Sequence, residues 1–175
     1  MLKVKWLQQT QMYLLCMLAF VIPFPFIYAA VTVGLLSAAW VLNCNFSETI
    51  NNLKTNKILL LWILLFALHG LSYFYSIDKN HAAFNLEQKL SLIIFPIIIG
   101  AGININELWL NRILLFFVSG ITAVAIICIA NATYIYFISG HTTQFFYHEL
   151  VYFLDANAVY LAWYTIFSLC LLLFF

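Results

Sequence analysis

Long apolar runs without a charged residue are the feature that most limits what this chain can fold into. The first, from Met12 to Leu42, holds 31 residues without Asp, Glu, Lys or Arg, and further runs follow. Soluble domains carry about 25% charged residues, whereas this chain has 7% charged residues, 66% hydrophobic residues and a mean hydropathy of +1.03. We expect an all-α integral membrane protein, because the runs have helix length rather than the alternating pattern of barrel strands.

The first run is too long for one comfortable span. As a single helix it would measure ~46 Å, against a hydrocarbon core of ~30 Å. Pro23 and Pro25 lie in its middle, and proline lacks the backbone N–H and disfavours helix in the residue before it. We predict a helical hairpin, from Gln9 to Ile22 and from Phe26 to Leu42, with the prolines at its turn.

The rest of the chain divides in the same way into apolar spans and polar connections. The polar segments are a loop at Asn43 to Lys57, a polar ledge at Ser76 to Lys89, a link at Asn104 to Arg112 and an aromatic loop at Ser139 to Asn157. The further spans are Ile58 to Tyr75, Leu90 to Ile105, Ile113 to Ile138 and Ala158 to Phe175. This gives about six spans in a single domain, residues 1–175. The last run has no flanking polar anchor, so we expect a truncated sixth helix and a chain that is the front part of a longer protein.

The basic residues predict the orientation in the membrane, because cytoplasmic loops hold the excess of lysine and arginine. With the hairpin and a cytoplasmic N-terminus, five basic residues lie inside and two outside, whereas a single first helix would give four against three. The inside residues are Lys3, Lys5, Lys54, Lys57 and Arg112, and the outside residues are Lys79 and Lys89. The hairpin arrangement places the polar ledge and the aromatic loop on the external side.

Neither nucleic-acid binding nor a cysteine-based metal site is supported by the composition. The net charge of +1 provides no basic field for nucleic acid. The four cysteines form no CxxC or Cys/His ligand spacing and are interpreted as structural thiols. They are Cys16, Cys44, Cys128 and Cys170.

The aromatic loop contains the pair His148 and Glu149, which resembles the start of an HExxH zinc motif. That motif fails, because position 152 is Tyr152. His141 and His148 are seven residues apart and would share a helix face, with Glu149 near enough to join a metal site. A structural zinc site normally has four ligands. A hydrated loop whose His and Glu cap helices or contact lipid headgroups is therefore the better interpretation.

Two polar residues, His69 and Asn131, fall inside predicted spans, where polar groups are costly and usually face the bundle interior. Hydrogen bonds between helices are the simpler interpretation. A transport path or proton relay is the alternative, but no charged residue accompanies them within the spans.

The chain has seven basic and six acidic side chains, and the polar ledge holds four of them. Asp78 is placed to cap a helix whose apolar face uses Ala82, Leu86 and Leu90. Lysine at the membrane surface suits phosphate or pyrophosphate headgroups as a compact cationic donor, and ordinary interfacial anchoring is the alternative. The charged side chains left near the surface are Lys79, Glu87 and Lys89.

Three stretches carry a resemblance to known proteins: IPFPF at Ile22 to Phe26, NLEQKLSLIIFP at Asn85 to Pro96 and FFYHELVYFLDANAVYLAWY at Phe145 to Tyr164. They resemble sequences of the bacterial O-antigen ligase and O-antigen polymerase superfamily of multi-spanning membrane glycosyltransferases. The resemblance covers nearly the whole chain in order, on motifs that are mostly hydrophobic.

This resemblance implies transfer of a glycan from an undecaprenyl-pyrophosphate carrier to the lipid A core or to a growing O-antigen chain. The reaction would occur at the periplasmic face of the bacterial inner membrane, with membrane lipids as further partners and without a metal or other cofactor. Essential Arg and His residues of such enzymes lie in a periplasmic loop after the sixth span, so these 175 residues are expected to be catalytically incomplete.

The substrate-binding residues that we expect lie on the two external segments. They are Lys89, Glu87, His148 and Glu149. The alternatives are an inactive fragment, a partner-dependent membrane subunit and a transporter of lipid-linked sugars.

Overall fold

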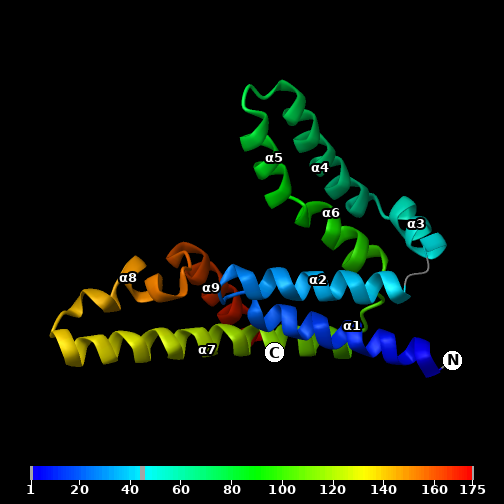
Figure 1. Ribbon diagram of the computed structural model, residues 1–175. Coiled ribbons are helices and arrows are strands. Elements are labelled where there is room, and N and C mark those ends of the chain that lie inside the picture. Colours follow the sequence, from blue (N-terminus) through cyan, green and yellow to red (C-terminus); the bar gives the residue numbers. More distant parts are fainter. Residues whose placement is uncertain (1, 44–45, 175) are drawn as a thin grey trace. The chain divides into compact units, whose positions relative to one another are not determined.

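A computed structural model describes residues 2–43 and 46–174, and these residues form helices joined by short connections, without a strand (Figure 1). The first half holds α1 (Leu2–Val21), α2 (Phe26–Asn43), α3 (Phe46–Thr55), α4 (Lys57–Tyr75), α5 (Lys79–Gln88) and α6 (Ser91–Phe95). The second half holds the π-helix η1 (Pro96–Ala101), α7 (Glu107–Ser139), the 3-10 helices η2 (Thr142–Phe145) and η3 (Tyr152–Leu154), α8 (Tyr147–Val151) and α9 (Ala158–Phe174). The predicted all-α class is confirmed for this part of the chain.

Four helical segments among the described residues are long and apolar enough to cross a membrane. They are α2, α4, the stretch Lys79–Ala101 and α7. A fifth would be the pair Tyr147–Leu154 and Ala158–Leu173, which is bent by 95°. The predicted count of about six is not confirmed. The first half of α1 carries Gln8, Gln9 and Gln11, which lower its hydropathy.

The proline turn is confirmed. Helix α1 ends at Val21 and α2 begins at Phe26, and the backbone N–H of Phe24 donates to Val21 O at 3.0 Å. Helix α1 begins at Leu2 rather than at the predicted Gln9, because residues 2–8 contain no Pro or Gly that would stop the helix. The Nε2 of Gln11 donates to Ala39 O at 3.3 Å, which joins the two arms of the hairpin.

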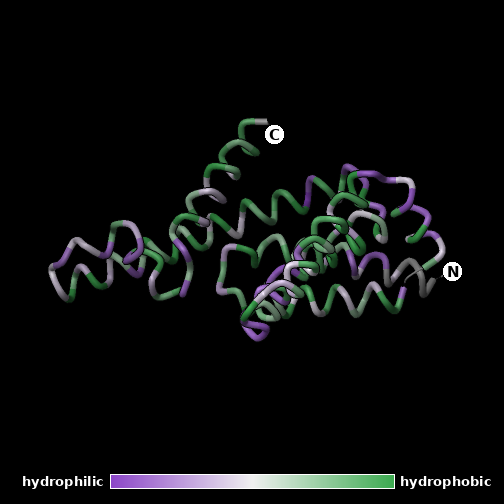
Figure 2. Tube along the Cα trace, turned by 90° about the horizontal axis from the view of Figure 1, so that it is seen from above, coloured by the Kyte–Doolittle hydropathy of each residue, from purple (hydrophilic) through white to green (hydrophobic). Residues whose placement is uncertain are grey.

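The chain divides into two compact units, which are described separately. Unit 1 holds Met1–Gln11 and Ser37–Asn104, and unit 2 holds Met12–Leu36 and Ile105–Phe175. Figure 2 shows apolar residues along much of the longer helices and hydrophilic residues gathered mainly at turns and ends. The shorter helices α3 and α5 are mostly polar.

In unit 1, the predicted polar loop at Asn43 to Lys57 contains a helix, α3, so that prediction is wrong for residues 46–55; residues 44 and 45 lie outside the described part. The Nδ2 of Asn52 on α3 donates to Ala101 O at the end of η1, at 3.0 Å. The predicted fourth span, Leu90 to Ile105, ends early, at Ala101. It is built from α6 and η1, which begins at Pro96, where the chain has no N–H for the α-helical pattern.

In unit 2, α7 is longer than the predicted span Ile113 to Ile138 and includes the second half of the predicted link. At 1.5 Å per residue its 33 residues measure about 50 Å, which exceeds a hydrocarbon core of about 30 Å. Its buried residues follow a helical spacing on one face: Phe117, Gly120, Ile121, Val124, Cys128 and Ala132. Asn106 caps its start through a bond from Trp109 N, and Gly140 with φ 71° ends it.

The predicted aromatic loop, Ser139 to Asn157, is mostly helical rather than a loop, because it contains η2, α8 and η3. Val151 is buried against Val124 and Cys128 of α7, and this contact folds the segment back onto that helix. The predicted sixth span corresponds to α9, which begins at Ala158 as predicted; Phe175 lies outside the described residues.

The thiol prediction is confirmed for two positions. Cys16 and Cys128 are free and buried, whereas Cys170 is free and exposed. Cys44 lies outside the described residues.

Candidate functional site

A polar groove lies between α4 and α5 in unit 1, two helices that run side by side in Figure 1. Its volume is about 280 Å³. The lining residues are His69, Ser72, Ser76, Asp78, His81, Ala82, Asn85, Leu86 and Lys89. Helix α4 is apolar over most of its surface, whereas α5 is mostly polar, so the groove lies where a polar helix packs along an apolar one.

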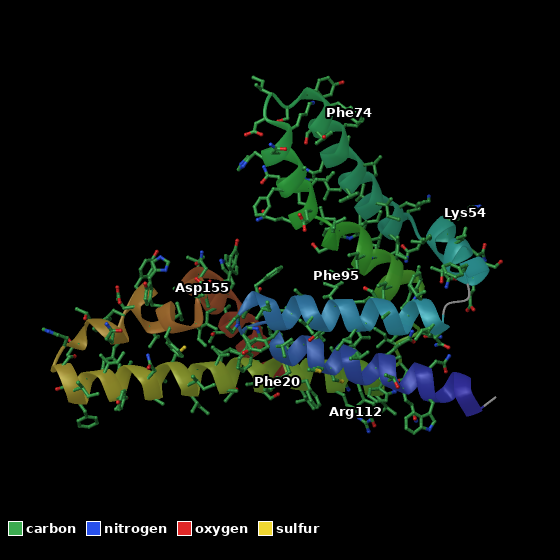
Figure 3. All side chains as sticks on the ribbon, viewed as in Figure 1. Phe20, Lys54, Phe74, Phe95, Arg112 and Asp155 are labelled. Carbon is green, nitrogen blue, oxygen red and sulfur yellow. The ribbon has the colours of Figure 1, made fainter. Side chains whose placement is uncertain are left out.

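The turn between the two helices is held by hydrogen bonds. The Nζ of Lys79 donates to Tyr73 O at 2.8 Å and to Phe74 O at 3.0 Å, which satisfies carbonyls at the end of α4. The same Nζ lies 5.1 Å from the centre of the Tyr73 ring. Figure 3 labels Phe74 at this turn. Lys79 therefore has a structural role.

Asp78 caps α5, as the sequence predicted. Its Oδ1 accepts a hydrogen bond from the backbone N–H of His81 at 3.0 Å. Ser76 supports the same turn, because its Oγ donates to Asp78 O at 2.9 Å. These bonds fix the end of the groove nearest the turn.

Lys89 and His69 meet at the opposite end of the groove. The Nζ of Lys89 lies 3.2 Å from Nδ1 of His69. An ammonium group has donors and no acceptor, so a charged Lys89 requires His69 to accept through Nδ1. The imidazole then carries its proton on Nε2. Both side chains are half-buried.

This pairing leaves hydrogen-bond donors for a ligand. Lysine has three N–H donors, and only one of those on Lys89 is directed at His69. The Nε2–H of His69 and the amide of Asn85 add two more donor groups along the same groove. The carboxylate of Asp78 also lines the groove, with one oxygen bound to His81 N. Lys89 therefore supplies the positive charge that an anionic ligand needs there.

The four predicted binding residues fall into two pairs. Lys89 lines the groove, whereas Glu87 is exposed on α5 and is not among the lining residues. His148 and Glu149 are exposed on α8, in unit 2, where the rings of Tyr147 and His148 lie 4.2 Å apart.

His141 and His148 do not share a helix face, as the metal-site alternative would require. His141 precedes η2 and His148 lies on α8, so no single helix carries both. Within residues 2–43 and 46–174, no group of three or more His, Cys, Asp or Glu side chains is placed to hold a metal ion.

The two polar residues within predicted spans, His69 and Asn131, differ in their contacts. His69 contacts Lys89 across the α4–α5 pair, which agrees with the predicted interhelical hydrogen bond. Asn131 is half-buried on α7, and none of the hydrogen bonds found among the described residues involves its side chain.

Sequence reasoning missed His69 as a site residue, although a signal was present. The turn at residues 76–78 makes α4 and α5 antiparallel, which brings His69, in the last two turns of α4, to Lys89 at the end of α5. Pairing of residues across the predicted turn would have brought His69 to Lys89.

Comparisons with protein-family models, with curated proteins and with solved structures found no match for this chain. The functional argument therefore rests on the groove and on the sequence.

Proposed function

We propose that this protein binds the pyrophosphate of a lipid-linked glycan in the α4–α5 groove, as part of a membrane glycosyltransferase of the O-antigen ligase or polymerase type. The observation that carries the proposal is the contact between Lys89 and His69 in the polar groove between the apolar helix α4 and the polar helix α5. Several helices of the chain are long and apolar enough to cross a membrane, which is where a polyprenyl carrier resides.

The groove chemistry favours a phosphate-bearing headgroup over a neutral one. Lys89 acts as a compact cation with unused donors, and His69 adds a donor through Nε2. Hydrogen bonds from an ammonium to phosphate oxygens are roughly twice as strong as neutral ones. A pyrophosphate would offset the desolvation of a half-buried Lys89.

In the proposed reaction, an acceptor hydroxyl attacks the anomeric carbon of the glycan. A new C–O bond forms, the bond from the anomeric carbon to the pyrophosphate oxygen breaks, and a base takes the hydroxyl proton. Positive charge beside the leaving pyrophosphate stabilises the negative charge that develops there, and Lys89 is the residue that we assign to this role. The acceptor would be the lipid A core or a growing O-antigen chain, at the periplasmic face, with the N-terminus in the cytoplasm.

Lipid analysis tests the proposal. The full chain, expressed in bacterial membranes and isolated with its bound lipids, should retain undecaprenyl-pyrophosphate species that native mass spectrometry detects. Lys89→Ala should lower their occupancy about tenfold, the loss expected when about 1.4 kcal/mol of binding is removed. Lys57→Ala serves as the matched control, because it removes the same charge from the far end of α4. Equal occupancy in both variants would contradict the proposal.

A further inference from the structure

A second groove lies in unit 2, between the proline turn and the bend that precedes α9. Its volume is about 390 Å³. The lining residues are Ile22, Pro23, Phe24, Phe26, Ala29, Asp155, Ala156, Asn157, Tyr160, Leu161 and Tyr164. Figure 3 labels Asp155 at this bend.

Both walls of this groove are held by local structure. Asp155 has φ 49°, in the left-handed region, and its N–H donates to Tyr152 O at 3.0 Å. The Oδ1 of Asn157 accepts from Val159 N at 2.9 Å, which caps the start of α9. Phe24 and Ala156 pack against the buried cluster around Val151. The groove is therefore preformed.

The chemistry of the lining is aromatic and acidic. Four aromatic side chains line the groove: Phe24, Phe26, Tyr160 and Tyr164. Asp155 is the one charged residue among the lining residues, and no Lys, Arg or His joins it there. None of the hydrogen bonds found among the described residues involves the Asp155 carboxylate, whereas the side-chain amide oxygen of Asn157 already accepts from Val159 N.

These features select among ligand classes. An anion would meet the carboxylate of Asp155 without a compensating cation. A lipid tail alone would bury that carboxylate without a partner, which is costly. An alkylammonium group suits both the aromatic and the acidic lining residues, because the face of an aromatic ring and a carboxylate each attract a positive charge.

We propose that the groove between the proline turn and Asp155 binds an organic ammonium group. The aromatic side chains of Tyr160 and Phe24 face its methyl or methylene groups, and Asp155 balances its charge. The two cation–aromatic contacts found among the described residues, Lys79 on Tyr73 and Arg112 on Trp109, lie elsewhere, so these rings are free of the protein's own cations. This inference stands on the groove alone and does not depend on the proposed function.

The test uses choline as the probe and the full chain in phosphatidylglycerol nanodiscs. Saturation-transfer NMR should show saturation of the choline N-methyl protons above that of protein-free nanodiscs. Asp155→Asn should reduce this saturation about tenfold. Asparagine tolerates the left-handed conformation, so this variant keeps the bend while it removes the charge. Tyr160→Ala should reduce the saturation similarly.

Matched controls separate a specific site from general attraction. Glu107→Gln and Tyr134→Ala change an exposed carboxylate and an exposed aromatic residue of α7, outside the groove, and should leave the saturation unchanged. The neutral choline analogue 3,3-dimethylbutanol should give little saturation. Equal saturation with this analogue, or an undiminished signal in Asp155→Asn, would overturn the proposal.

Two further arms identify the source of the ammonium group. Displacement of choline by phosphatidylethanolamine built into the nanodisc would assign the groove to a lipid headgroup. Displacement by soluble ethanolamine alone would assign it to a free amine. Both results support an ammonium site, whereas the absence of displacement by either amine would contradict it.

Discussion

Lys89 Nζ lies 3.2 Å from Nδ1 of His69, although 20 residues separate the two in sequence. The contact closes the end of the α4–α5 groove away from the turn. Because an ammonium group can only donate, a charged Lys89 pairs with a His69 ring that accepts through Nδ1 and carries its proton on Nε2.

The first prediction concerns this tautomer. In the wild-type chain, ¹⁵N NMR of labelled histidine should show Nδ1 of His69 as an unprotonated acceptor. Lys89→Met removes the donor while it keeps much of the side-chain volume, so the two tautomers should become mixed. Lys57→Met should leave the His69 signals unchanged, because Lys57 is not among the residues that line the groove. Unchanged His69 signals in Lys89→Met would show that the contact is not formed.

The second prediction concerns the cap of α5. Asp78→Ala removes the acceptor for His81 N and should destabilise the start of the helix by about 1 kcal/mol. Amide hydrogen exchange at residues 79–82 should accelerate by about fivefold accordingly. Asp78→Asn should retain protection, because asparagine caps as well as aspartate. Equal exchange in both variants would contradict the capping role.

The third prediction concerns close helix packing in unit 2. A Cβ at Gly120 of α7 would overlap the backbone carbonyl of Phe20 on α1. Small residues at such contacts allow membrane helices to approach closely. Gly120→Ala should lower the free energy of unfolding by roughly 1–3 kcal/mol, the usual cost of overpacking. Unfolding by added sodium dodecyl sulfate, followed by circular dichroism, measures this change.

Gly34→Ala is the control for that experiment. A Cβ at Gly34 meets nothing within 4 Å, and the residue lies inside α2. Replacement of glycine by alanine in a helix interior stabilises by about 0.5–1 kcal/mol. A loss of stability in Gly34→Ala as large as in Gly120→Ala would show that the close contact is not the cause.

The fourth prediction couples Gly102 to Trp40. The nearest atom to a Cβ at Gly102 is Nε1 of Trp40, which is buried and has no hydrogen-bond partner. Gly102→Ala alone should therefore cost roughly 1–3 kcal/mol. In a Trp40→Phe background the nearest colliding atom is absent and the close approach of the Ile98 carbonyl oxygen remains, so the same substitution should cost less. A double-mutant cycle by detergent unfolding should give a coupling energy of about 1 kcal/mol, and a value near zero would contradict this contact.

Local signals predicted the local features of the fold well. Pro23 and Pro25 placed the hairpin turn, and Asp78 placed the start of α5, because both effects depend on neighbouring residues alone. The apolar runs predicted α2, α4 and α7, since bilayer length and hydropathy are readable from sequence.

Features that depend on contacts between distant residues were not predicted. The polar residues of α3 predict a loop, but the segment is a helix. It is held against η1 by the hydrogen bond from Asn52 to Ala101 O, which the sequence does not reveal. The folding of residues 139–157 back onto α7 depends on burial of Val151. The role of His69 required the pairing of α4 with α5. The four expected binding residues stay a prediction as a set, since they lie in two separate units.

Titration of the wild-type chain with defined lipids tests the central claim most directly. In nanodiscs, we expect undecaprenyl pyrophosphate to bind at least about tenfold more tightly than undecaprenol, which has the same tail and no pyrophosphate. The difference should shrink as salt concentration rises, because added ions screen the attraction between Lys89 and the headgroup. Equal affinity for the two lipids would contradict a pyrophosphate site in the α4–α5 groove.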